Sequence, residues 1–327
     1  MYLNLLRISI VTAFVVVVLG AYTRLSDAGL GCPDWPGCYG NIAVPVSQDH
    51  IDLSNENYAS RPLEQDKAWK EMIHRYAAGT LGLLILALAV MAWKNRQGDD
   101  KIFLPVVLVI LVVFQALLGM WTVTLLLKPI IVMGHLLGGM TILLLLVWSY
   151  LKQRHPAQYA AAGRSPLFGW AVLGLAVVFI QISLGGWVSA NYAALICPDL
   201  PVCRGQWWPP MDFLEGFIPW RGLGKNYEFG VLGPEARTAV HISHRIGALV
   251  TLIIVGMIAV KSMLSSNNRI RHTGIALLLV LLAQFSLGVA NILLTLPIGV
   301  AVAHNAVAAL LLLCSGILLF HTRFSTI

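Results

Sequence analysis

The stretch Cys32-Pro33-Asp34-Trp35-Pro36-Gly37-Cys38-Tyr39-Gly40 recurs in the second half of the chain as Cys197-Pro198-Asp199-Leu200-Pro201-Val202-Cys203-Arg204-Gly205. Three more features recur at a nearly constant spacing of 165 to 170 residues: His74-Arg75 as His244-Arg245, Phe114-Gln115 as Ala283-Gln284, and His135 as His304. So constant a spacing over separate features indicates that the chain is a duplicated unit.

The composition is typical of a protein embedded in a membrane. The chain has 327 residues, of which 58% are hydrophobic and 11% charged, and its mean hydropathy is +0.77. Soluble domains carry about a quarter charged residues, and a helix that spans a bilayer needs roughly 20 apolar residues. Eight stretches meet that length, at about 8–23, 72–93, 102–124, 130–151, 167–189, 238–260, 273–295 and 298–320. No small-residue cleavage site follows the first stretch, which predicts a retained anchor rather than a signal peptide.

The number of spans predicts how the two halves are related. Four spans per half is an even number, so both halves enter the membrane in the same direction and form a parallel repeat about the membrane normal. We therefore predict an all-α integral membrane protein of two tandem four-helix bundles, residues 1–155 and 156–327, an architecture whose core can house cofactors. Long loops at about 25–70 and 190–237 join the first two spans of each half.

The charge distribution predicts the orientation. A net charge of +7 alone would fit a nucleic-acid partner, but the cations are concentrated in the short inner segments. These segments hold Arg7, Lys94, Arg96, Lys101, Lys152, Arg154, Arg164, Lys261, Arg269, Arg271 and Arg323, against Asp99 and Asp100. The positive-inside rule then predicts a multi-pass protein of a bacterial-type inner membrane, with both termini cytoplasmic and the long cysteine-containing loops outside. Nothing remains that indicates nucleic-acid binding.

Four histidines carry the strongest functional signal. His74, His135, His244 and His304 fall on the second, fourth, sixth and eighth spans, within about the first two turns of each, and all four spans run from outside to inside. All four imidazoles should therefore lie at a similar shallow depth. A histidine in a membrane can simply hydrogen-bond to a neighbouring helix, and zinc prefers four clustered ligands, often with cysteine. One pair of histidines per bundle fits haem iron better.

Charged neighbours of these histidines predict further roles. Arg75 and Arg245 follow the candidate ligands directly and could pair with haem propionates, or could extend outward to the interface. Glu71 precedes His74 by one turn, whereas the aligned residue of the second half is His241. Glu71 could accept a proton or stabilise a cation. Alternatively, the helix dipole could simply favour a glutamate near the start of this helix. This asymmetry favours the first bundle for catalysis. His241 could compete with His244 as a ligand, but His244 is preferred because His244-Arg245 aligns with His74-Arg75.

The cysteines and the remaining histidines follow simpler patterns. Cys32 with Cys38, and Cys197 with Cys203, lie on the predicted outer side, where disulfides persist, and intervening prolines favour tight turns. Whether these pairs are structural or redox-active depends on strain and exposure, so both interpretations stay open. Cys314 is predicted to be buried in the last span. The other histidines are predicted to be solvated; they are His50, His155, His272 and His321.

Taken together, these residues resemble the haem A synthase family over essentially the whole chain. The motifs that carry the resemblance are Thr23-Arg24-Leu25 before the Cys32–Cys38 loop, Glu71-Met72-Ile73-His74-Arg75, Gly134-His135, His244-Arg245 and Ala303-His304-Asn305. The resemblance implies an oxidoreductase acting on CH groups. It would oxidise the C8 methyl of haem O to a formyl group by successive hydroxylations, with water as oxygen source, to give haem A.

The resemblance also implies roles for individual residues. His244 and His304 would hold a haem b cofactor, while His74 and His135 would hold the iron of the substrate haem O, with Glu71 as the essential acidic residue. The cysteine pairs of the family map onto Cys32 with Cys38 and Cys197 with Cys203. Expected partners are haem O synthase and the terminal oxidase assembly machinery. The redox partner and the oligomeric state, a homo-oligomer included, stay open.

Three other functions fit parts of the pattern. A membrane dihaem electron-transfer cytochrome would use all four histidines, but such carriers usually place haems toward opposite faces. A transporter would be expected to carry its site near the midplane on broken helices. A non-catalytic, haem-binding oxidase assembly factor would share every ligand with the enzyme.

Overall fold

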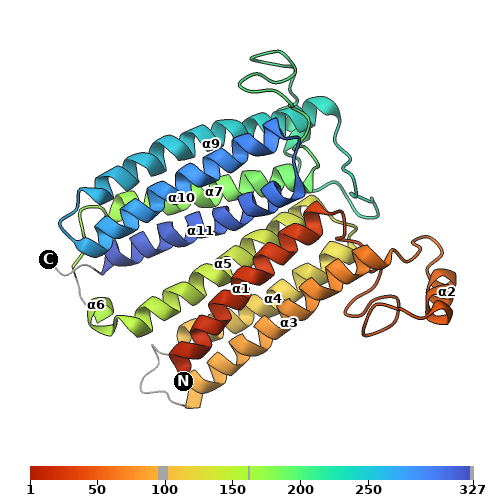
Figure 1. Cartoon of the computed structure of the whole chain (residues 1–327), viewed down its shortest axis with the longest axis horizontal. Helices are drawn as coiled ribbons and strands as arrows, with labels where there is room; N and C mark the ends of the chain where they lie inside the picture. The colour runs from red at the N-terminus through yellow and green to blue at the C-terminus, as the bar shows by residue number, and fades with distance from the viewer. Residues whose placement is uncertain (95–101, 161–162, 325–327) are drawn as a thin grey trace.

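The computed structural model describes residues 1–94, 102–160 and 163–324, and long helices dominate it (Figure 1). Eight of the described helices are long and apolar enough to cross a membrane: α1 (Tyr2–Leu25), α3 (Gln65–Lys94), α4 (Phe103–Thr124), α5 (Pro129–Arg154), α7 (Phe168–Ala190), α9 (Pro234–Met263), α10 (Asn268–Leu293) and α11 (Ile298–Arg323). Shorter helices are α2 (Gln48–Asn57), α6 (Pro156–Ala160) and α8 (Phe213–Gly216). The eight predicted spans are confirmed, and the protein is a multi-pass membrane protein. Four charges used above, Arg96, Asp99, Asp100 and Lys101, lie outside the described residues.

The long helices form two bundles with the same ring order. In the first bundle α1 and α4 each pack against both α3 and α5. In the second, α7 and α10 each pack against both α9 and α11. Figure 1 shows the two bundles side by side, with both termini at one end and the long loops at the other. The predicted all-α duplicated architecture is confirmed.

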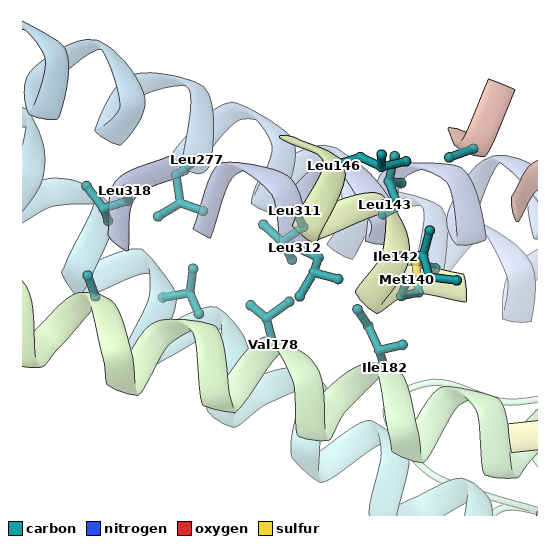
Figure 2. Packing of buried hydrophobic residues seen from close by; sticks show 14 of the residues in the cluster. Met140, Ile142, Leu143, Leu146, Val178, Ile182, Leu277, Leu311, Leu312 and Leu318 are labelled. Atoms are coloured by element: carbon teal, nitrogen blue, oxygen red, sulfur yellow. The ribbon is translucent and has the colours of Figure 1, made fainter. Parts of the chain in front are cut away.

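The contact between the bundles has approximate two-fold symmetry. Helix α1 packs against α11, its counterpart α7 packs against α5, and α5 meets α11 between them. Each contact thus has an equivalent contact in which the two halves exchange roles. This pattern is that of an isologous interface. Figure 2 shows Val178 and Ile182 of α7 facing Leu311 and Leu312 of α11, close to the side chains of α5. Apolar side chains of both bundles thus form one continuous core, which non-directional apolar burial stabilises.

Helix ends explain why the predicted boundaries were too short on the outer side. Helix α3 begins nine residues before His74 and α9 ten residues before His244, because polar first turns extend both helices beyond their apolar stretches. Hydropathy detects the part of a helix that suits lipid, not the whole helix. The prediction that His74 and His244 lie within the first two turns was therefore wrong. It holds for His135 and His304, whose helices begin six residues earlier, at Pro129 and Ile298.

Sequence-distant loops interlock the two halves at the end of the bundles opposite the termini (Figure 1). The segment after α8 crosses to the first bundle, where the Tyr227 backbone N–H donates to the Leu126 carbonyl at 3.0 Å. Lys128, in the turn between α4 and α5, is 1% exposed; its ammonium lies 3.1 Å from the Trp220 ring centroid and donates to the Gly222 carbonyl. Arg61 forms an ion pair with Glu228. The second half therefore covers part of the first.

Candidate functional site

The structure brings His74 of α3 and His135 of α5 together. Helices α3 and α5 are diagonal in their ring, and the two imidazole centroids are 6.4 Å apart with an interplanar angle of 80°. Metal–imidazole bonds of about 2 Å put two ring centres about 6 Å apart when both rings bind one ion from opposite sides. The pair therefore has the separation that one shared iron requires. His244 and His304 occupy the equivalent places on the diagonal helices α9 and α11.

Each of the four histidines lies against a glycine of an adjacent helix. A methyl group added to Gly20 would lie 2.9 Å from Cε1 of His74, and one added to Gly185 would lie 3.1 Å from Cε1 of His244. A methyl group added to Gly119 would lie 3.4 Å from Cε1 of His135, and one added to Gly288 would lie 3.2 Å from Cε1 of His304. Sequence analysis missed these positions as site residues. Their repeat spacing, which matches that of the histidines, is the signal that could have found them.

Glutamines one turn before three of these glycines approach the histidines. Gln115 Nε2 donates to the His135 carbonyl at 2.8 Å, and Gln284 Nε2 lies 3.2 Å from His304 Nε2. Gln181 Nε2 lies 3.0 Å from His244 Nδ1 and donates to the His244 carbonyl at 3.0 Å. The recurrence of Gln115 and Gln284 was visible in the sequence, but their role was not, and Gln181 was missed.

Buried polar atoms without partners test whether this arrangement fits haem. Nδ1 of His74, His135 and His304 is buried without a side-chain hydrogen-bond partner, and the side-chain oxygens of Gln115, Gln181 and Gln284 are buried without a partner. Across the described ranges, no group of three or more His, Cys, Asp or Glu side chains could hold a metal ion. Paired imidazoles with glycines beside them fit haem iron, because histidine nitrogens are common protein ligands of that iron.

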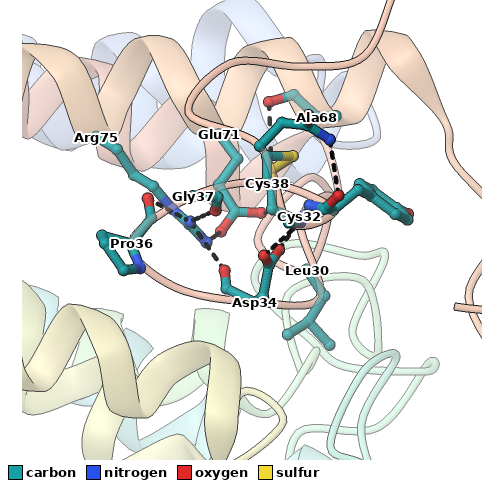
Figure 3. The surroundings of a disulfide bond; sticks show 12 residues. Leu30, Cys32, Asp34, Pro36, Gly37, Cys38, Ala68, Glu71 and Arg75 are labelled. Atoms are coloured by element: carbon teal, nitrogen blue, oxygen red, sulfur yellow. Dashed lines mark hydrogen bonds and ion pairs between the residues drawn. A yellow bond between two sulfur atoms is a disulfide. The ribbon is translucent and has the colours of Figure 1, made fainter. Parts of the chain in front are cut away.

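Glu71 links α3 to the first disulfide loop (Figure 3). Its side chain is 6% exposed; one carboxylate oxygen accepts a hydrogen bond from the Cys32 backbone N–H at 2.9 Å, and the other pairs with Arg75. Buried charges are stable only when they are paired and hydrogen-bonded, and here both oxygens are. Which groups hold Glu71 could not be predicted from the sequence, because Cys32 is 39 residues away.

Arg75 and Arg245 both bind the carbonyls of their disulfide loops. Arg75 donates to Gly37 at 2.6 Å, Asp34 at 3.0 Å and Pro36 at 3.3 Å. Arg245 donates to Cys197 at 2.7 Å and to Val202 at 2.9 Å, while its Nε is buried without a partner. The two arginines thus anchor the disulfide loops to the helices that carry His74 and His244. Their pairing with propionates stays a prediction.

His241 has a different hydrogen-bond partner from His244. It is 5% exposed, and its Nδ1 lies 2.8 Å from the carbonyl of Ala193, in the segment that follows α7. His244 instead packs against Gly185 and contacts Gln181. The geometry therefore favours His244 over His241 as the candidate ligand.

The cysteine loops have the same local structure in both halves. Cys32–Cys38 and Cys197–Cys203 form disulfides, with Cα atoms 4.8 Å and 4.6 Å apart. Asp34 accepts from the Tyr39 and Gly40 backbone N–H groups at 2.7 Å, and Asp199 accepts from Gly205 at 2.8 Å. Gly40 and Gly205 adopt φ of 75° and 74°, a left-handed conformation that glycine reaches without strain. Cys314, the free cysteine of the described residues, is only partly buried.

The remaining histidines are not all solvated. His50 and His272 are exposed and His155 is partly buried, but His321 is 7% exposed, with its Nδ1 3.0 Å from the side-chain nitrogen of Gln158. The prediction of a solvated His321 was wrong, because Gln158 and His155, from the segment that follows α5, pack against it.

Comparison with known proteins gives the family. Residues 4–315 match the family described as cytochrome oxidase assembly protein. The chain is 46% identical over 313 residues to a heme A synthase of Shewanella oneidensis, which covers 94% of this chain and 93% of that protein. The chain belongs to the haem A synthase family. Heme A synthases of Caulobacter vibrioides and Nitrosospira multiformis are 29% and 28% identical, over 91% of this chain and 89% and 86% of theirs. The family resemblance predicted from the motifs is confirmed.

Proposed function

We propose that this protein is an oxidoreductase that converts haem O to haem A by oxidising the C8 methyl group to a formyl group. The observation that carries the proposal is the His74–His135 pair, whose ring centroids lie 6.4 Å apart across the first bundle. It occurs in a chain 46% identical to a heme A synthase. Each of the two hydroxylations adds an oxygen from water and removes a pair of electrons and a pair of protons. The resulting gem-diol loses water to give the formyl group.

The two bundles have different tasks in this proposal. Residues 1–155 form the substrate domain, where His74 and His135 hold the iron of haem O. Residues 156–327 form the cofactor domain, where His244 and His304 would hold haem b. Haem b, when bound there, would supply one-electron redox chemistry. Arg75 and Arg245, at the outer end of each site, pair with propionates.

Glu71 is the acidic residue of the substrate site. It lies one turn before His74 on α3, and the second half has no carboxylate at the equivalent position, which is His241. A carboxylate held by the Cys32 N–H and by Arg75 has a fixed position. Once the methyl carbon has lost an electron pair and a proton, this carboxylate can stabilise the resulting cation and accept a proton from the water that adds to it. The first disulfide loop thereby supports Glu71 and orients it.

The proposal includes an orientation and partners. Both termini face the cytoplasm and the cysteine loops face the outside of a bacterial-type inner membrane. Haem O is too apolar to cross water readily, so it passes directly from a haem O synthase, and haem A passes on to terminal oxidase assembly.

Co-expression with a haem O source, followed by chromatography of the extracted porphyrins, tests the function. The wild-type protein should convert haem O to haem A, and Glu71→Ala should stop conversion while haem b stays bound. Unconverted haem O in the wild type would indicate a haem-binding assembly factor. Two permanently bound haem b groups would indicate an electron-transfer cytochrome.

A further inference from the structure

The two candidate haem sites differ in one buried amide. In the second bundle, Gln181 of α7 contacts His244 twice, at its ring Nδ1 and at its backbone carbonyl, each at 3.0 Å. The glycine that lies against each ring fixes the alignment of the halves, because Gly185 lies against His244 as Gly20 lies against His74. Counting one turn back from each glycine aligns Gln181 with Val16. The first bundle therefore has no amide at this place.

A second substitution between the halves accompanies the first. A methyl group on Gly247 would overlap the amide oxygen of Gln181, so this amide fits only because residue 247 has no side chain. The first-half residue that follows its histidine at the same distance is Ala77. Glutamine with glycine in one half thus corresponds to valine with alanine in the other. The half that has the glutamine has a glycine where the amide needs room, and the half that lacks the glutamine has an alanine there.

The amide can hold either tautomer of the His244 ring. Its nitrogen donates, and its oxygen, buried without a partner, can accept after rotation of the amide. When the ring nitrogen that does not bind metal donates its N–H to an acceptor, here the rotated amide oxygen, the hydrogen bond fixes the orientation of a ligand histidine and raises its basicity. At His74 the equivalent Nδ1 is buried without a side-chain partner and faces only the Val16 backbone.

We propose that Gln181 is a positioning residue that fixes His244 as a permanent ligand, and that Val16 leaves His74 free to release its haem. The inference rests on the proposed function, since it assumes a haem at each histidine pair. It explains how two bundles of one architecture can hold a resident cofactor in one and an exchangeable substrate in the other.

Haem release from the purified full-length protein tests the proposal. The protein loaded with haem b is mixed with excess apomyoglobin as haem acceptor, and the reduction potential is measured in parallel. Gln181→Val should speed release from the second bundle by roughly 10- to 100-fold, the usual effect of removing a partner of a ligand histidine. It should also make the potential more positive, because a less basic ligand stabilises ferric iron less. Ser183→Ala is the matched control, since Ser183 lies on the same helix and its hydroxyl donates only to Phe179.

The reciprocal exchange tests the first bundle. In a His244→Ala/His304→Ala background only the first site remains, and Val16→Gln/Ala77→Gly should slow haem release from it. Equal release rates and potentials for Gln181→Val and Ser183→Ala would overturn the inference. If His244→Ala binds as much haem as the wild type, the proposed function fails instead, because the second bundle then holds no haem at these histidines.

Discussion

The two halves of this chain share an architecture but differ at the residues around their histidine pairs. Both have a histidine–glycine contact on each diagonal helix and an arginine bound to the carbonyls of a disulfide loop. They differ at Glu71 and His241, at Val16 and Gln181, and at Lys128 and Pro297. Shared features therefore indicate what any such bundle needs to hold a porphyrin. Under the proposed function, the differences mark where the substrate site departs from the cofactor site.

Removing one ligand from each half should separate the two roles most strongly. His244→Ala should lose bound haem b, whereas His74→Ala should keep it. Both should lower haem A formation by roughly 100-fold or more, because displacement of a reacting group by about 1 Å already has that effect. Pyridine haemochrome spectra of the purified variants measure the haem content. Loss of haem b from His74→Ala would contradict the assignment of the halves.

Exchanging the acidic position should have the next largest effect. Glu71→Gln keeps an oxygen for the Cys32 N–H but has no carboxylate, so haem A formation should fall by roughly 10²- to 10⁴-fold. His241→Gln, the matched change in the second half, should leave the rate unchanged, since an amide N–H can still donate to Ala193. Extracted porphyrins report the rate. Full activity of Glu71→Gln would mean that Glu71 only holds the loop.

Removal of either disulfide should lower stability by a similar amount, but only removal of Cys32–Cys38 should lower activity. Cys32→Ser/Cys38→Ser and Cys197→Ser/Cys203→Ser should each lower the unfolding free energy by about 2–4 kcal/mol. Only the first pair supports Glu71, so only its removal should also slow haem A formation, by roughly tenfold or more. Thermal unfolding and porphyrin extraction of both double variants measure the two effects. Equal activities would place the loop outside the catalytic machinery.

Alanine at the histidine-contacting glycines should act in the order of their distances. Gly20→Ala, with its methyl 2.9 Å from His74, should destabilise the protein by about 1–3 kcal/mol, as overpacking does. Gly119→Ala, at 3.4 Å from His135, should be neutral or slightly stabilising, since alanine favours helices over glycine. Thermal unfolding of haem-free protein gives the ranking. A larger loss at Gly119 than at Gly20 would contradict it.

The ion pair between the outer loops should give the smallest effect. Glu228→Gln breaks the pair with Arg61 and should lower the unfolding free energy by at most about 1 kcal/mol. The control is Glu64→Gln, because Glu64 pairs with Lys67 but is 65% exposed and should contribute almost nothing. Thermal unfolding of the two variants compares them directly. A larger loss from Glu64→Gln would show that burial does not govern these pairs.

The sequence predicted the periodic features and missed the long-range ones. Eight apolar stretches and a constant repeat spacing were enough for the fold, because each lipid-spanning helix must satisfy its own backbone. The histidine pairs followed from the same repeat. The partners of Glu71, Arg75 and His241 did not, since loops distant in sequence supply them. A glycine beside a ring, such as Gly20, becomes visible only when the neighbouring helix is in place.

The crossing of the segment after α8 onto the first bundle has a consequence for any attempt to cut this protein in two. A fragment ending at residue 155 would lack the carbonyl that takes up the Lys128 ammonium, the carboxylate that neutralises Arg61, and the buried Tyr227 ring beside Leu126. It would therefore expose the Lys128 ammonium, which the Trp220 ring covers in the intact molecule. Separately produced halves would therefore be expected to need the segment after α8 on the first-half fragment, which it covers, although the second half of the sequence contains it.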